Sequence, residues 1–207
     1  MKLHVFKKLK EMKKVIIISC AVLLSTYMRS QPGVTIPLNQ EPTFNLQSGT
    51  YIKDTEDALQ PYVGIWEGIW SGKKITLSIS AVSHHLIISP SKYHYEDILV
   101  EKYTITDVAT NTIIASTMNN ADINEAKIIN SGTGKNNQMY FFYSDIDLCS
   151  ISATILLKRD LANPNQMHYS FSHEEFWMTE SCPFYNDPNG IPIPLPMESV
   201  MLSRILN

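Results

Sequence analysis

Four residues in the last quarter of the chain are of types that bind metal ions. They are His168, His173, Glu174 and Glu175, and zinc accepts histidine and carboxylate ligands. In an extended strand, residues two apart point to the same side, so His173 and Glu175 could converge. His168 and His173 are five apart and would point to opposite faces. We therefore interpret the group as a solvated patch and predict no metal and no cofactor.

Other residues that commonly serve in catalysis lack the neighbours that catalysis requires. Glycoside hydrolysis needs two carboxylates at a defined separation, and the acid pairs Glu174–Glu175, Asp145/Asp147 and Glu96–Asp97 are candidates only because acids are common in this sequence. No serine lies in a glycine-flanked nucleophile elbow, and the glycine-rich stretch at 132–135 lacks the spacing of a phosphate-binding loop. The sequence therefore identifies no catalytic residue, and a hydrolase is the least favoured hypothesis.

Two cysteines, Cys149 and Cys182, lie in the body of the chain. Neither has a recognisable catalytic neighbour. An oxidising compartment would permit a disulfide between them. The alternative is two separate buried thiols that behave as small apolar residues. The sequence leaves both interpretations open.

The first 31 residues have the three parts of a signal peptide. A basic stretch ends at Lys14, an apolar run covers Val15–Leu24, and polar residues follow. An apolar run of about ten residues is too short to span a bilayer, which takes about 20. We predict a signal peptide at 1–31, beginning at Met1 or at Met12. The mature protein would be exported to the periplasm, the cell envelope or the medium, with no transmembrane span.

The charge of the remaining chain excludes one class of partner. Seven of the 17 basic residues and one of the 20 acidic residues lie in 1–31, which leaves ten basic and nineteen acidic residues. The formal net charge of that part is −9. Nucleic-acid binding depends on lysines and arginines that neutralise phosphates. We therefore predict no nucleic-acid partner.

The body of the chain has the pattern of a mainly β protein. β-branched and aromatic segments alternate with turn residues, after a flexible lead-in at 32–50 and a short helical turn at 55–59. Residues 121–130 fit a short helix or an irregular strand. This pattern indicates a sandwich or a closed barrel, and periodicity alone does not choose between them. Strands are expected at 63–71, 74–82, 85–89, 97–107, 111–118, 138–144, 149–158, 167–178 and 199–205.

An ordered series of short segments resembles a known family. The segments are YIKDT at 51–55, YVGIW at 62–66, YEDILV at 95–100, PLP at 194–196 and VML at 200–202. Together they look like an uncharacterised, domain-of-unknown-function family of small exported proteins from Bacteroidetes-type bacteria. The resemblance implies one antiparallel, up-and-down, lipocalin-like β-barrel of about 8–10 strands over 51–207, with a short N-terminal helix. Residues 121–150 depart from the family, and the resemblance implies no activity.

The triplet from Gly64 to Trp66 resembles the glycine-any-tryptophan signature that opens the first strand of lipocalins. In that fold a basic residue near the last strand lies over the tryptophan and closes the base of the barrel. Arg204 is placed to do this, and an arginine over an indole gains about 0.5–2 kcal/mol. The alternative is a core tryptophan and a solvated arginine.

Trp66, Gly68 and Trp70 share one face of the first strand. They could form the floor of a ligand cavity, or they could be ordinary core packing. Three functions follow: a module that binds a small hydrophobic molecule, a structural or interaction protein of the envelope with a filled barrel, and a hydrolase. We favour binding. The oligomeric state is not specified by the sequence. The residues expected to point into the barrel are Trp66, Trp70, Tyr140, Phe142, Phe171 and Trp177.

Overall fold

The computed structural model describes residues 33–40, 46–133, 137–173 and 178–206. The expected signal peptide lies outside these residues. Within them the chain forms β-strands and three 3-10 turns, and these ranges contain no α-helix. The turns are η1 (Gln60–Tyr62), η2 (Ile123–Glu125) and η3 (Ile146–Leu148). The strands are β1 (Thr35–Pro37), β2 (Thr50–Lys53), β3 (Gly64–Trp70), β4 (Lys73–Ser89), β5 (Lys92–Asp107), β6 (Ile113–Ser116), β7 (Ile128–Thr133), β8 (Gln138–Asp145), β9 (Ile151–Arg159), β10 (Gln166–Ser172) and β11 (Val200–Arg204).

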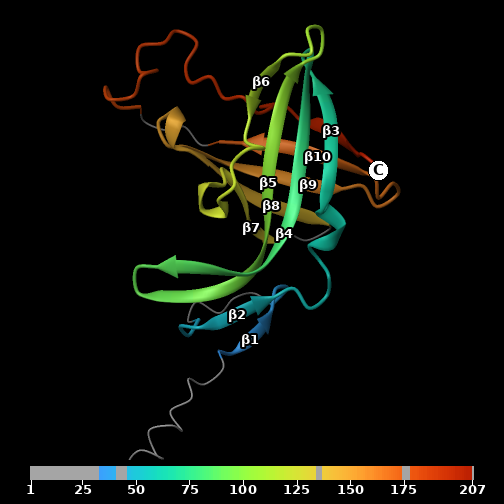
Figure 1. The fold of residues 1–207 in the computed structure, drawn as a ribbon, viewed down its shortest axis with the longest axis vertical. Coiled ribbons are helices and arrows are strands. Elements are labelled where there is room, and N and C mark those ends of the chain that lie inside the picture. Colours follow the sequence, from blue (N-terminus) through green and yellow to red (C-terminus); the bar gives the residue numbers. More distant parts are fainter. Residues whose placement is uncertain (1–32, 41–45, 134–136, 174–177, 207) are drawn as a thin grey trace, which may run out of the picture. The chain divides into compact units, whose positions relative to one another are not determined.

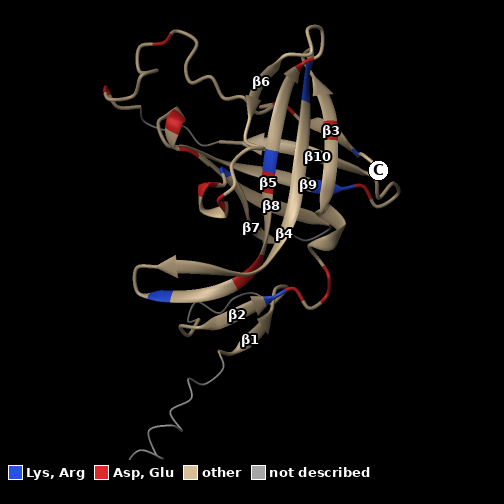
Figure 2. Cartoon of the chain, viewed as in Figure 1, with Lys and Arg blue, Asp and Glu red and all other residues tan. Residues whose placement is uncertain are grey.

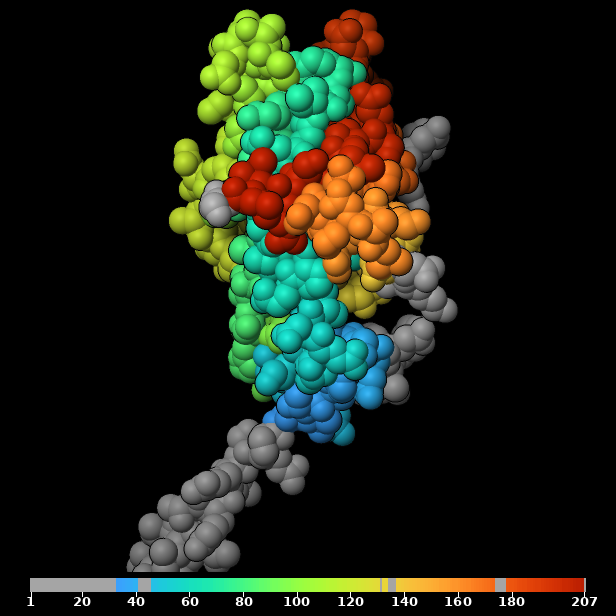
Figure 3. All heavy atoms as spheres, turned by 90° about the vertical axis from the view of Figure 1, so that its right-hand side faces the viewer, coloured from blue at the N-terminus to red at the C-terminus, as the bar shows by residue number. Residues whose placement is uncertain are grey.

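Eight of these strands close into an antiparallel barrel (Figure 1). The order around it is β3, β4, β5, β7, β8, β9, β10 and β11, and every neighbouring pair is antiparallel. β5 pairs with β7 through Glu101 and Ile128. β11 lies between β10 and β3 and pairs with both, which closes the barrel (Figure 3). The mainly β, up-and-down barrel is confirmed. The sandwich is excluded.

The barrel core consists of alternate side chains of each strand, as the two-residue period requires. On β8, Met139, Phe141 and Tyr143 point inward and are buried. The prediction that Tyr140 and Phe142 point inward was wrong, since they are 37% and 51% exposed. Both faces of this strand carry aromatic residues, so hydrophobicity did not distinguish them, and a shift by one residue exchanges the faces. Trp177 lies outside the described residues.

Two of the expected strands form one long strand. β4 continues from 73 to 89, with a bulge between Val82 and His85 where His84 has a positive φ of 57°. β5 is longer than expected and pairs with β4 along its full length. The segment 121–130 has a mixed structure, since η2 is followed by β7, which begins at Ile128.

The helical turn expected at 55–59 is displaced along the chain. The carboxylate of Asp54 accepts hydrogen bonds from the backbone N–H groups of Ala58 and Leu59, both at 2.9 Å, and this holds a non-helical turn. The 3-10 turn forms afterwards at 60–62 with Pro61 near its start. A proline fits there because the first N–H groups of a helix have no intrahelical partner.

The distal parts of β4 and β5 form an arm at 83–97 that projects past β3 (Figure 1). β2 pairs with β5 in parallel, and β1, which lies inside the expected lead-in, pairs with β2. Asp97 holds the base of the arm: its carboxylate accepts hydrogen bonds from Tyr51 Oη at 2.6 Å and from the N–H groups of His84 and Asp54. Burial would raise the pKa of Asp97, but these bonds outweigh it and lower the pKa.

One end of the barrel is closed by an arginine on a tryptophan. Trp66 is completely buried, and its Nε1 donates to the carbonyl of Tyr62 at 2.8 Å. The guanidinium carbon of Arg204 lies 4.3 Å from the centre of the Trp66 ring. Its two terminal nitrogens donate to the carbonyls of Val63 (2.8 Å) and Pro61 (2.5 Å). We call this group the barrel floor.

Gly64 leaves the space that the floor needs. Its φ of +138° is unfavourable for residues with a side chain. A Cβ on this residue would lie 3.2 Å from a guanidinium nitrogen of Arg204. A glycine at this point therefore lets the arginine approach the tryptophan and the carbonyls beside it.

We predict that Arg204→Met destabilises the protein by about 2–3 kcal/mol, because two charge-assisted hydrogen bonds and the contact with the indole are lost. Urea unfolding measures the change. Ser203→Ala, on the same strand and exposed, is the matched control and should change the free energy of unfolding by less than about 0.5 kcal/mol. Equal stabilities of the two variants would contradict the role of the floor.

Candidate functional site

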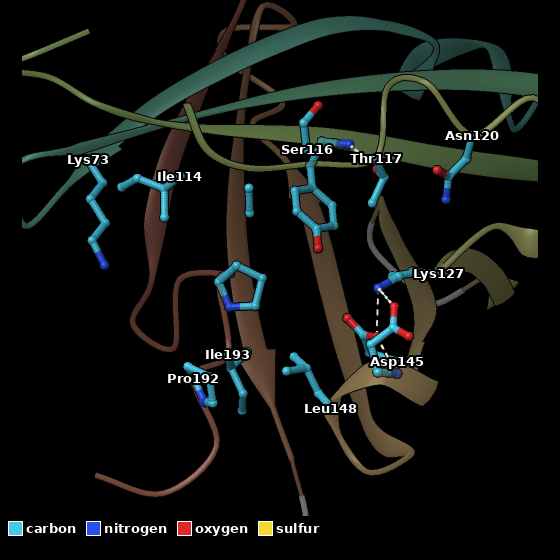
Figure 4. A pocket seen from close by; sticks show the side chains of 14 residues that line it. Lys73, Ile114, Ser116, Thr117, Asn120, Lys127, Asp145, Leu148, Pro192 and Ile193 are labelled. Atoms are coloured by element: carbon cyan, nitrogen blue, oxygen red, sulfur yellow. Dashed lines mark hydrogen bonds and ion pairs between the residues drawn. The ribbon is translucent and has the colours of Figure 1, made fainter. Parts of the chain in front are cut away.

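A pocket of about 740 Å³ lies at the other end of β3 from the floor. Gly64 begins β3 beside Arg204, whereas Lys73, which lines the pocket, follows the end of β3. We call this space the mouth pocket (Figure 4). Its lining residues are Lys73, Tyr103, Ile114, Ala115, Ser116, Thr117, Asn120, Lys127, Asp145, Asp147, Leu148, Pro192, Ile193 and Pro194.

Two facing walls give the pocket its apolar surface. One wall is β6, which pairs with β5 and carries Ile114. The opposite wall consists of Leu148 and of the irregular segment that contains Pro192 and Ile193 (Figure 4). A ligand between these walls would remove apolar surface from water on both sides.

A disulfide anchors the irregular wall. Cys149 and Cys182 form a bridge with an S–S distance of 2.06 Å, across 33 residues of sequence. Cys149 directly follows η3, so the bridge ties the segment that leads to Pro192 to the turn between β8 and β9. The sequence left open a disulfide or two separate thiols, and the structure contains the disulfide.

A lysine with two carboxylates forms the polar side of the pocket. Lys127 Nζ lies 2.6 Å from Asp145 Oδ1 and 3.1 Å from Asp147 Oδ2 (Figure 4). Asp145 is buried and also accepts a hydrogen bond from Tyr143 Oη at 3.1 Å. Burial alone would lower the pKa of Lys127, but the hydrogen bonds to the two aspartates raise it. Lys127 is therefore protonated, and the group contains two acids, Asp145 and Asp147, and one base.

A carboxyl group without a partner lies next along β5. Glu101 and Tyr103 are two residues apart on the inward face, and Tyr103 lines the pocket. Glu101 is 2% exposed, and neither of its oxygens has a hydrogen-bond partner among the described residues. Burial raises its pKa from 4.5 to about 8. Strongly perturbed acids of this kind are found preferentially at functional sites.

Two tyrosines interact electrostatically with this carboxyl, and a third interacts with both of them. Burial raises the pKa of Tyr103, Tyr143 and Tyr169, and the charge of Glu101 raises the pKa of Tyr103 and Tyr169 further. Tyr103 and Tyr143 are hydrogen-bonded to each other. The hydroxyl of Tyr169 has no partner in the described part of the chain. The acid therefore lies among neutral hydroxyl groups.

The three residues expected to bind a ligand do not line the mouth pocket. Trp66 belongs to the floor, and a Cβ on Gly68 would lie only 2.7 Å from side-chain atoms of Val200 and Leu202. Gly68 therefore allows β3 to pack closely on β11. Trp70 is half-buried, and the Lys73 ammonium lies 6.0 Å from its ring centre. Ligand binding by Trp66, Gly68 and Trp70 stays a prediction.

The histidines expected to form a solvated patch are only partly described. His168 is exposed on β10, and the His173 ring lies 6.2 Å from Phe171. Glu174 and Glu175 lie outside the described residues. Within the described ranges, no three histidine, cysteine or acidic side chains are grouped closely enough to hold a metal ion.

The sequence contained a signal for Glu101 that the prediction missed. Leu99, Glu101, Tyr103 and Ile105 alternate along the strand expected at 97–107, and an acid within an otherwise buried face is exceptional. Asp145 and Lys127 carry no such signal, because their meeting depends on the pairing of β7 with β8.

No family model matches this sequence, and neither the curated proteins nor the solved structures contain a significant match. The resemblance to an exported family therefore stays a hypothesis. In the described ranges, no helix has the length and apolar character needed to cross a membrane.

We predict that protein stability falls as pH rises from about 5 to 8, because of Glu101. In this range the folded protein keeps a proton on Glu101 that the unfolded chain has lost, since the pKa is about 8 in the fold and 4.5 ordinarily. The slope is up to about 1.4 kcal/mol per pH unit for one proton. Glu101→Gln should remove this part of the slope and stabilise the protein at pH 8.

Urea unfolding at pH 5.5 and pH 8 tests this. Glu56→Gln, an exposed acid in the loop before η1, is the matched control and should keep the slope of the parent. If Glu101→Gln and the parent lose stability in parallel as pH rises, Glu101 is ionised in the fold and the prediction fails.

The disulfide gives a second prediction. Replacing both Cys149 and Cys182 by serine should destabilise the protein by about 3–4 kcal/mol, as expected for a bridge across 33 residues. The same variant should lose protection from hydrogen exchange in the segment 183–195, which the bridge anchors. Unchanged exchange there would show that packing alone holds the wall.

Proposed function

We propose that this is an exported protein that binds a small amphipathic molecule in the mouth pocket. The observation that carries the proposal is the pocket itself, which has about 740 Å³ and lies at the end of the closed barrel opposite the floor. Pockets of about 300–1,000 Å³, apolar with a few polar groups, are typical of small-molecule sites.

The contents of the pocket favour an amphipathic ligand over a purely hydrophobic one. Ile114, Leu148 and Ile193 offer apolar surface, whereas Lys127 and Asp145 offer charge on one side. A purely apolar ligand would either trap water against the charged residues or displace that water without replacing its hydrogen bonds. Both outcomes cost free energy. A ligand with an apolar body and one polar head matches both parts.

Export rests on two features. The basic and apolar pattern of residues 1–31 is that of a signal peptide. The bridge between Cys149 and Cys182 is of a kind that persists in oxidising compartments and is rare in the cytosol. Periplasm, cell envelope and medium all satisfy this condition.

A filled barrel that serves as a structural or interaction protein is the second candidate. It is favoured by the packing of the barrel interior, where Trp66, Phe141 and Leu202 are fully buried. The arm would offer the contact surface, because Leu86 and Ile88 on it are exposed. Its strand β4 also carries no charged residue after Lys74 (Figure 2).

Binding of the fluorescent dye N-phenyl-1-naphthylamine, which has an apolar body and one uncharged polar group, distinguishes the two candidates. We expect saturable binding with one site per chain. Ala115→Phe, which places a ring in the pocket, should weaken the binding at least about tenfold, as expected when a ligand loses more than 1.4 kcal/mol of contact.

The matched control is Ala81→Phe, which adds the same ring at an exposed position of β4. It should leave the affinity of the pocket unchanged. Absence of dye binding, or equal loss in both variants, would contradict binding in the mouth pocket and favour the filled barrel.

A further inference from the structure

We infer that the mouth pocket selects amphipathic molecules whose polar head is a cation, such as an alkylammonium group. This inference rests on the proposed function and adds the chemical class of the ligand. It depends on how acids, bases and hydroxyl groups are distributed between the pocket and the unpartnered carboxyl next to its lining.

The charges that line the pocket do not favour an anionic head. The ammonium of Lys127 already contacts Asp145 and Asp147, so an anion would have to compete with two carboxylates. Lys73 is exposed and lies near the face of Trp70. A lysine at an exposed rim is screened by water and salt. The lining contains two lysines and two aspartates, so its charges balance and leave no buried, unpaired ammonium for an anion.

Glu101 adds an acid next to the pocket lining, because the next inward residue of its strand, Tyr103, lines the pocket. It precedes Tyr103 by two residues on the same strand face, which corresponds to about 7 Å. Its neighbours across the sheet are Ile79 and Ile128. The groups that interact with it electrostatically are the hydroxyls of Tyr103 on β5 and Tyr169 on β10, and neither is a base. The fold thus holds a carboxyl for which the described residues provide no counter-charge.

A cation in the mouth pocket would supply that counter-charge. Its field would favour the ionised form of Glu101, which releases its proton to solvent as the cation binds. The ring of Tyr103, which lines the pocket, could also contact an ammonium group, because aromatic faces attract cations. An anion in the same place would face Asp145 and would keep Glu101 protonated.

Two probes with the same tail and fixed opposite charges test the inference: decyltrimethylammonium and decanesulfonate. Isothermal titration calorimetry at pH 7 should give about tenfold tighter binding of the cation, which corresponds to about 1.4 kcal/mol. The affinity for the cation should rise severalfold from pH 6 to pH 9. Neither probe titrates in this range, so the change would come from the protein.

Glu101→Gln should abolish most of the rise with pH and reduce the preference for the cation. This variant loses a buried acid and should fold at least as well as the parent, so lost binding would not reflect unfolding. Glu56→Gln, an exposed acid far along the chain from the pocket residues, is the matched control and should bind both probes like the parent.

The possible results separate this inference from the proposed function. Equal affinity for both probes, or tighter binding of the sulfonate, overturns the cationic ligand class while binding in the pocket stands. A preference for the cation that is unchanged in Glu101→Gln overturns the role of Glu101. If neither probe binds and the dye does not bind, the proposed function fails, and this inference fails with it.

Discussion

The structure depends on the closure of the barrel at Trp66 and Arg204. These residues lie on the first and last strands of the barrel and pair directly in its sheet. A closed sheet has no unpaired edge within the barrel, and this removes the main route by which strands associate wrongly. The floor fixes more than the sheet, because Arg204 also donates hydrogen bonds to the carbonyl of Pro61 within η1 and to that of Val63 just after it. This end is filled by an indole and a guanidinium, and the mouth pocket lies at the opposite end of β3.

The polar interior near the mouth lowers the stability that the apolar core provides. A leucine or isoleucine at position 101 would pack among Ile79 and Ile128 without a desolvation cost, whereas a carboxyl there must stay protonated or lose hydration. Tyr143 donates a hydrogen bond to Asp145, so the polar groups beside Lys127 have partners. The carboxyl oxygens of Glu101 have none among the described residues. A partly satisfied network is a poor structural device. Its position next to the lining of a pocket is easier to explain by ligand recognition than by folding.

The strand pattern could be predicted because it depends on local alternation. Ile75, Leu77 and Ile79 alternate with hydroxyl residues, and the structure buries all three. Where both faces were apolar, as at Tyr140 and Phe142, alternation gave the wrong face. The turn before η1 was misplaced because the Asp54 carboxylate, outside the expected helix, captured its N–H groups. The mouth pocket could not be predicted at all. Its walls come from β6, from η3 and from the irregular segment near Pro192, and their meeting is a long-range consequence of the barrel.

The irregular wall connects the proposed ligand site to the compartment. Between 178 and 199 the chain has neither strand nor helix, so few backbone hydrogen bonds hold it to the barrel. Its attachments include the buried Leu195, which belongs to the core, the bridge at Cys182, and side-chain hydrogen bonds of Glu198 and Ser199 to the barrel. In a reducing environment only Leu195 and its neighbours would remain, and Pro192 and Ile193 would be held from one side. The shape of the pocket therefore depends on an oxidised disulfide, and an exported protein is the kind in which such a wall keeps a single conformation.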